Sequence, residues 1–170
     1  MGVAVALTLA LLAVGASALT DQPHKYFRQA VLVNAPRHVV WDVLTDFESY
    51  PDWNPYVTSA RGTLREGATL HLRREPPGDG SKTADAEILI VRENRKLEWQ
   101  VRKLVAGVLD EEQIFRTKRI APTMTNLVEE TRLEGLLAPV TGTDDARRGL
   151  RLMILALARE AERRYQSSSE

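Results

Sequence analysis

The chain has 170 residues, of which 44% are hydrophobic and 27% charged, which is enough for one sizeable core and too short for two ordinary domains. Lysine plus arginine and aspartate plus glutamate each total 23, so the net charge is zero and nucleic acid is not expected as a partner. Cysteine is absent, which excludes disulfides, thiolate nucleophiles and cysteine-ligated metals.

The first twenty residues carry no charged side chain, and residues 3–14 form an apolar run of signal-peptide length. The small residues 16–18 follow, which predicts a secretory signal cleaved after Ala18 and export of the protein. Against this, the start of the chain lacks lysine and arginine, and the apolar stretch 3–19 approaches the roughly 17 residues of a minimal membrane span. An uncleaved membrane anchor and a misassigned start site are therefore the alternatives.

Residues 26–33 are rich in strand-forming residues and lead directly into a short amphipathic helix. Asn34 or Ala35 can cap this helix and Pro36 suits its first turn. Apolar residues then recur at helical spacing: Val39, Val40, Val43, Leu44 and Phe47. The aromatic and proline residues that follow cannot extend the helix but can wall the mouth of a cavity: Tyr50, Pro51, Trp53, Pro55 and Tyr56.

The chain up to Pro139 then reads mostly as strands separated by turn residues. The predicted strands are 57–64, 68–74, one centred on 88–91, 97–105, 111–120 and 123–133. In the predicted strand 97–105, one face carries the apolar residues Leu97, Trp99, Val101 and Val105. The other face carries Glu98, Gln100 and Arg102. One side of the sheet is therefore expected to be buried and the other to be wet.

A long helix is predicted at the end of the chain, capped by Thr143 or Asp144. Its apolar side chains form a continuous stripe: Leu150, Met153, Ile154, Leu157 and Ala161. Its acidic start and basic end suit the helix dipole. The order of strand, short helices, antiparallel strands and one long helix is an α+β plan, in which a curved sheet buries one face against that helix.

The segment 34–56 resembles the entry signature of the SRPBCC superfamily, the START-like or helix-grip proteins that include the polyketide cyclase/dehydrase and lipid-transport family. Further matches follow in order along the chain from residue 26 to about 165: residues 67–70, 97–99, Phe115 followed by Pro122, 134–139 and 156–162. The resemblance implies a helix-grip fold. Such a fold has a curved antiparallel sheet of about seven strands wrapped around a long C-terminal helix, with two short helices after the first strand.

These observations divide the chain into four segments. We expect a signal peptide or membrane anchor at 1–18, a linker at 19–25, a START-like ligand-binding domain at 26–166 and a tail at 167–170. The expected location is secreted or extracytoplasmic, with the N-terminal apolar segment as a potential site of membrane association. The sequence does not indicate an oligomeric state.

A curved sheet that grips one helix leaves a space suited to a ligand. Patterning predicts a mostly apolar lining able to hold a lipid-like or aromatic molecule: Trp53, Tyr56, Trp99, Phe115, Leu136, Met153 and Leu157. The alternative for each of these side chains is that it simply fills the core. Asn54 is either a turn residue that satisfies local backbone groups or a ligand contact at the cavity entrance.

Polar side chains near the space decide between binding and catalysis. The strand alternation leaves open which of them point inward: Arg102, Arg116, Arg132, Gln113, Glu129 and Glu130. Most are expected in solvent, but an inward arginine paired with an inward glutamate polarises a carbonyl and moves a proton, as a cyclase or dehydratase requires. His71 points opposite to its neighbours Leu70 and Leu72, which indicates the exposed face, with a general-base role as the alternative.

The three histidines lack the spacing of metal ligands, and no hydrolase, phosphate-loop or dinucleotide motif occurs, so we predict neither a metal nor a cofactor. The resemblance and the apolar pocket favour binding or transport of a small hydrophobic molecule, lipid-like or polyketide-like. One alternative is a cofactor-independent polyketide cyclase, dehydratase or isomerase. Another is an interaction module whose groove binds a protein.

Overall fold

The structure is a computed structural model that describes residues 24–78, 80–103 and 105–168. The predicted signal peptide or anchor at 1–18 lies outside these residues, as do residues 19–23 of the predicted linker and 169–170 of the tail. These assignments and the predicted export stay predictions. His24 and Lys25, placed in the linker by sequence, already belong to the first strand.

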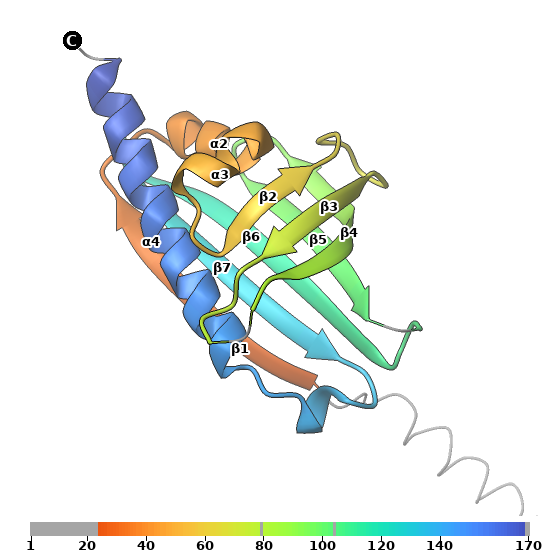
Figure 1. Cartoon of the computed structure of the whole chain (residues 1–170). Coiled ribbons are helices and arrows are strands. Elements are labelled where there is room, and N and C mark those ends of the chain that lie inside the picture. The colour runs from red at the N-terminus through yellow and green to blue at the C-terminus, as the bar shows by residue number, and fades with distance from the viewer. Residues whose placement is uncertain (1–23, 79, 104, 169–170) are drawn as a thin grey trace, which may run out of the picture.

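Across the described residues, seven strands form one antiparallel sheet in the order β1-β7-β6-β5-β4-β3-β2 (Figure 1). The strands are β1 (His24–Val33), β2 (Val57–Arg61), β3 (Thr69–Arg74), β4 (Lys82–Arg92), β5 (Lys96–Lys103), β6 (Leu109–Ala121) and β7 (Met124–Glu134). The sheet curls around the long C-terminal helix α4 (Asp144–Ser167), which confirms the predicted helix-grip plan.

Two short α-helices, among the residues described, follow β1 as predicted: α2 (Arg37–Thr45) and α3 (Tyr50–Trp53), joined by the 3-10 turn η1 (Phe47–Ser49). The residue that caps α2 is Pro36, not Asn34 or Ala35. Asn34 is engaged elsewhere, because its backbone nitrogen and its side-chain amide both donate to a carboxylate oxygen of Glu162 on α4, at 2.8 and 3.0 Å. This contact ties the start of α2 to the end of α4.

The core lies between the sheet and α4. The predicted stripe of α4 is buried along its whole length, and it belongs to the same buried cluster as Leu97, Trp99 and Val101 of β5. The outer face of the sheet is less exposed to solvent than expected, since Glu98 is only 6% exposed. Lys96 forms an ion pair with the Glu98 carboxylate, which makes this burial tolerable.

The 3-10 turn η2 (Ala138–Val140) connects β7 to α4. No helix in the described ranges combines the length and the apolar character needed to cross a bilayer. Within the same residues, no group of three or more histidine, aspartate and glutamate side chains is placed to hold a metal ion.

Candidate functional site

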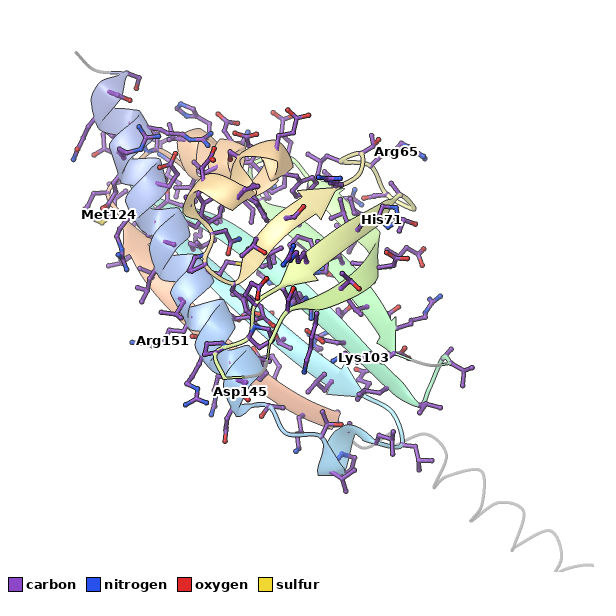
Figure 2. All side chains as sticks on the ribbon, viewed as in Figure 1. Arg65, His71, Lys103, Met124, Asp145 and Arg151 are labelled. Carbon is purple, nitrogen blue, oxygen red and sulfur yellow. The ribbon has the colours of Figure 1, made fainter. Side chains whose placement is uncertain are left out.

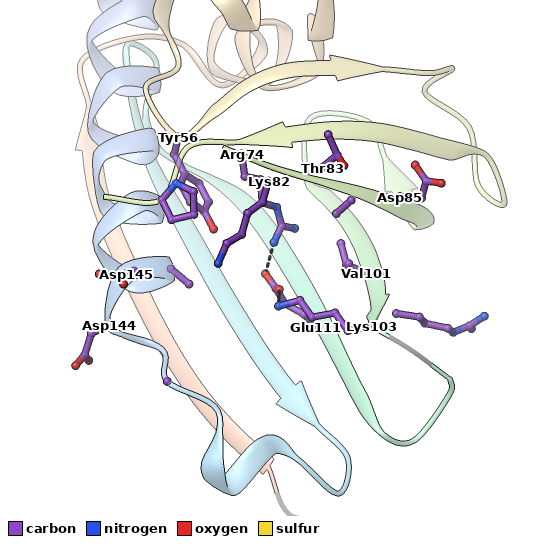
Figure 3. A pocket seen from close by; sticks show the side chains of 15 residues that line it. Tyr56, Arg74, Lys82, Thr83, Asp85, Val101, Lys103, Glu111, Asp144 and Asp145 are labelled. Atoms are coloured by element: carbon purple, nitrogen blue, oxygen red, sulfur yellow. Dashed lines mark hydrogen bonds and ion pairs between the residues drawn. The ribbon is translucent and has the colours of Figure 1, made fainter. Parts of the chain in front are cut away.

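A cavity of about 720 Å³ opens between the sheet and the start of α4 (Figure 3). Its walls come from Tyr56 after α3, from strands β3 to β6, and from the loop that leads into α4. Charged side chains supply eight of the fifteen described residues that line it. The lining is therefore more polar than the mostly apolar set that the sequence pattern indicates.

A buried ion pair forms the inner wall of this cavity. Arg74 ends β3, and its Nη1 donates to Oε1 of Glu111 on β6 at 2.8 Å, with both side chains less than 10% exposed. Lys103 Nζ lies 3.0 Å from the other carboxylate oxygen. Gln113 Nε2 donates to Glu111 Oε1 at 3.0 Å, and Trp99 Nε1 donates to Gln113 Oε1 at 2.7 Å. A chain of hydrogen bonds thus runs from the cavity into the core.

The charges of this pair are fixed by their surroundings. Burial by itself would raise the pKa of Glu111, but attraction to Arg74 and Lys103 outweighs it, so the pKa is lowered and the carboxylate stays ionised. Burial raises the pKa of Tyr56 to about 12, and its hydroxyl, which lies beside Arg74, is a neutral donor at physiological pH. The wall therefore carries an anion, two cations and a neutral hydroxyl.

Arg74 has hydrogen-bonding capacity left over. Its Nε and Nη2 are buried and have no hydrogen-bond partner among the described residues. A buried donor without an acceptor costs about 1–3 kcal/mol, more when it is charged. Because Arg74 lines the cavity, an oxygen atom of a bound molecule can satisfy these groups.

Glu129 on β7 is a second inward-facing carboxyl group. It is fully buried, Thr131 Oγ1 donates to its Oε1, and its Oε2 has no partner in the described part of the chain. Burial raises the pKa of Glu129 to about 7, and the nearby charge of Glu111 acts in the same direction. Glu129 is not among the residues that line the cavity, so we expect its protonation to affect the stability of the fold.

Tyr56 is positioned by a glycine of α4. A Cβ atom built on Gly149 would lie 2.2 Å from Cδ2 of the Tyr56 ring, which is far closer than atoms can approach. The ring of Tyr56 packs directly on the helix backbone at this point, and this contact sets where the ring stands in the cavity wall.

We expect Gly149→Ala to lower the free energy of unfolding by about 1–3 kcal/mol, because the new methyl group displaces the Tyr56 ring. Urea denaturation measures the change. Gly142→Ala is a matched control in the same cavity wall, since a Cβ there meets nothing within 4 Å. Equal effects of the two substitutions would contradict the packing of Tyr56 on α4.

The structure separates the residues predicted as a ligand lining. Tyr56 lines the cavity. Trp99, Phe115, Met153 and Leu157 are fully buried and fill the core, with the rings of Trp99 and Phe115 5.0 Å apart. These four side chains, which the sequence pattern places around a ligand space, pack in the buried core between the sheet and α4.

Three further candidates lie outside the cavity wall. Trp53 is half-buried, packs edge-on against Tyr50 and donates through Nε1 to Ser49 Oγ at 3.1 Å. Asn54 is buried, and its Oδ1 accepts hydrogen bonds from the backbone nitrogens of Tyr56 and Val57, at 3.1 and 2.9 Å. Leu136 follows β7 and is 72% exposed.

The charged strand candidates divide between the cavity rim and the outer face of the sheet. Arg102 belongs to the cavity wall and is exposed. Arg116 lies 3.4 Å from Glu130, and Arg132 lies 3.2 Å from Glu112, in pairs on the outer face. The structure does not bring these two pairs to the cavity.

His71 points to the exposed face of β3, away from α4, and its Nδ1 lies 2.7 Å from Asp85 Oδ1 (Figure 2). The residues that sequence reasoning missed are Arg74 and Glu111. A signal for Arg74 was present, because strand alternation places it on the same buried face as Leu72. The alternation therefore predicts a buried Arg74, whereas the usual exposure of arginine predicts the opposite.

Solved structures similar to this chain share its fold. A START superfamily protein from Mycobacterium smegmatis is 23% identical with a TM-score of 0.62, and the alignment covers 85% of this chain and 99% of that one. An aromatase/cyclase from Streptomyces sp. R1128 is 22% identical with a TM-score of 0.59, covering 84% and 96%. Norcoclaurine synthase from Thalictrum flavum is 12% identical with a TM-score of 0.63, covering 83% and 96%.

No curated protein matches the sequence. The family model described as polyketide cyclase / dehydrase and lipid transport matches residues 25–164, which is nearly all of the described chain. That match agrees with the helix-grip architecture and with the order of motifs along the sequence. The chain therefore belongs to the polyketide cyclase/dehydrase and lipid-transport family.

Proposed function

We propose that the protein binds a small, mainly apolar molecule with oxygen substituents, polyketide-like or lipid-like, in the cavity beside α4. Family membership supports the binding of a hydrophobic ligand or a polyketide-cyclase role. The observation that carries the proposal is Arg74, a buried guanidinium in the cavity wall with two nitrogens that lack a partner in the described residues. A ligand oxygen gives those nitrogens the acceptor that the protein does not supply.

The cavity suits such a ligand in size and surface. Its volume of about 720 Å³ falls in the usual range for small-molecule sites. Pro76, Ala84 and Val101 provide apolar contact, while the hydroxyl of Tyr56 adds a second donor beside Arg74. An oxygen-bearing aromatic or aliphatic skeleton meets both kinds of surface.

Binding of 2-naphthoate tests the role of Arg74, with neutral 2-naphthamide as the comparison ligand. Arg74→Lys keeps the charge but loses the planar fork, so we expect the dissociation constant for 2-naphthoate to rise about tenfold or more. Isothermal titration calorimetry measures it, and circular dichroism verifies the fold of the variant.

Arg116→Lys is the matched control, because Arg116 pairs with Glu130 on the outer face of the sheet. Its affinity for 2-naphthoate should equal that of the wild type. The proposal fails if Arg74→Lys also binds 2-naphthoate as tightly as the wild type. It also fails if neither naphthalene compound binds and native mass spectrometry finds no small molecule in the purified protein.

A polyketide cyclase or dehydratase is the second candidate function, favoured by the contact between Arg74 and Glu111 in the cavity wall. In such a reaction Glu111 takes a proton from the carbon next to a ketone, and Arg74 stabilises the oxygen of the enolate. The lowered pKa of Glu111 makes it a weak base, which favours binding over catalysis. Faster deuterium exchange at the methyl group of acetophenone, lost in Glu111→Gln, would support the enzyme.

A further inference from the structure

Four of the eight large apolar side chains exposed in the described part of the chain lie at one end of the molecule. Val140 is 80% exposed, Leu136 72%, Val105 67% and Leu137 38%. The backbone nitrogens of Leu136 and Leu137 donate to the carbonyls of Gly107 and Val108 at 3.1 and 3.0 Å, so the two loops lie side by side. We call these four side chains the apolar loop surface; exposed apolar clusters mark sites of interaction.

The backbone under this surface is fixed by packing. Leu109, Leu133 and Ala138 form a small buried cluster of their own beneath the loops. Gly135 has a φ of +111°, and a Cβ atom there would lie 2.7 Å from the carbonyl oxygen of Gly107. The two loops are thus in tight contact. Their packed backbones hold the apolar side chains on the outside.

We propose that the apolar loop surface docks on a lipid bilayer. The start of β1 lies at the same end of the molecule, because His24 pairs with Glu134, which directly precedes Gly135 (Figure 1). Residues 3–19 of the sequence are uncharged and close to the length of a minimal membrane span. Four residues lie between position 19 and His24, so the span is at most about 18 Å. The chain that precedes His24 therefore joins the described structure at the end that carries the apolar loop surface.

Docking in this orientation places the cavity next to the bilayer. Gly142, Asp144 and Asp145 line the cavity and follow Val140 within five residues. A lipid-soluble molecule could then pass between the bilayer and the cavity without crossing the full width of the aqueous phase. Docking depends on the apolar loop surface and does not depend on which molecule the cavity binds.

The absence of cysteine from the sequence allows a site-specific test on the full chain. An environment-sensitive NBD fluorophore is attached to Leu136→Cys and Val140→Cys, in the proposed surface. Leu32→Cys and Leu152→Cys are the controls, since these leucines are also exposed, at 59% and 45%, but lie on β1 and on α4. Each labelled protein is mixed with phosphatidylcholine vesicles, with and without spin-labelled lipid.

We expect the labels at positions 136 and 140 to shift to the blue, to brighten several-fold with vesicles and to be quenched by spin-labelled lipid. The two control labels should not respond. Sedimentation with vesicles without any response at 136 and 140 would overturn the inference, because attachment would then involve residues 1–23 alone. A blue-shifted label at 136 before vesicles are added would also overturn it, since protein would already cover the surface.

Discussion

Replacing Arg74 with methionine should lower the free energy of unfolding by about 3–5 kcal/mol, because it leaves the buried carboxylate of Glu111 without its closest cation. Glu111 is 3% exposed, whereas the remaining cation, Lys103, is 44% exposed and reaches one carboxylate oxygen from the surface. Water screens that second pair more strongly, so it does not replace the first. Urea denaturation at pH 7.5 measures the loss.

The double variant Arg74→Met with Glu111→Leu should recover most of this loss, since it removes both charges and leaves apolar groups of similar size. Arg132→Met breaks the more exposed pair with Glu112 and is the control, with an expected cost below about 1 kcal/mol. If Arg74→Met costs no more than Arg132→Met, the buried pair is not a determinant of stability.

The pH dependence of this loss has a definite sign. The folded state lowers the pKa of Glu111 below its ordinary value of 4.5, so the stabilisation is complete above that pH and is lost as the pH falls through the lowered pKa. The difference between wild type and Arg74→Met should therefore shrink in acid. A difference that stays constant down to pH 3 would contradict an ionised Glu111 as its source.

The fold could be predicted because its signals are local. Alternation along the strands and the apolar stripe from Leu150 to Ala161 each arise within one element, and the turn residues between strands set the antiparallel order. Where the prediction differed, a long-range contact decided the outcome. The backbone and amide nitrogens of Asn34 donate to Glu162, which is 128 residues away, and Pro36 takes the cap position of α2.

The site could be predicted only in part for the same reason. Tyr56 follows from the aromatic segment after α2, but Arg74 and Glu111 are 37 residues apart and lie on strands separated by two others. They meet because the sheet curls, and the register that aligns them is not encoded in either strand alone. Alternation also left Glu129 and Glu130 equivalent, although one is fully buried and the other joins Arg28 and Arg116 outside.

Glu129→Gln should raise the free energy of unfolding at pH 8 by about 3 kcal/mol, which is the value of a pKa shift of this size. The pKa of Glu129 rises from an ordinary 4.5 to about 7 in the folded protein, so the folded state binds an additional proton between these values. The stability of the wild type therefore falls as the pH rises from 4.5 to 7. Glutamine is neutral throughout, so the variant should lack this decline.

Thr131→Val tests the cause of the shift from the other direction. The hydroxyl of Thr131 donates to Glu129, and this hydrogen bond favours the ionised carboxylate and lowers its pKa. Without it the pKa of Glu129 should rise further, and the loss of stability should continue to higher pH. Guanidinium denaturation from pH 4 to pH 9 measures both variants against the wild type.

The two buried carboxyl groups change the free energy of unfolding in separate pH ranges and in opposite directions. The effect of Glu129 can therefore be told apart from that of Glu111. Glu111 stabilises the fold above pH 4.5 and loses its effect in acid, whereas the neutral form of Glu129 is favoured below about pH 7. A slope between pH 5 and 7 that disappears in Glu129→Gln must therefore come from Glu129. Parallel curves for wild type and Glu129→Gln over that range would mean that this carboxyl group is hydrated in solution, and that the sheet and α4 do not enclose it.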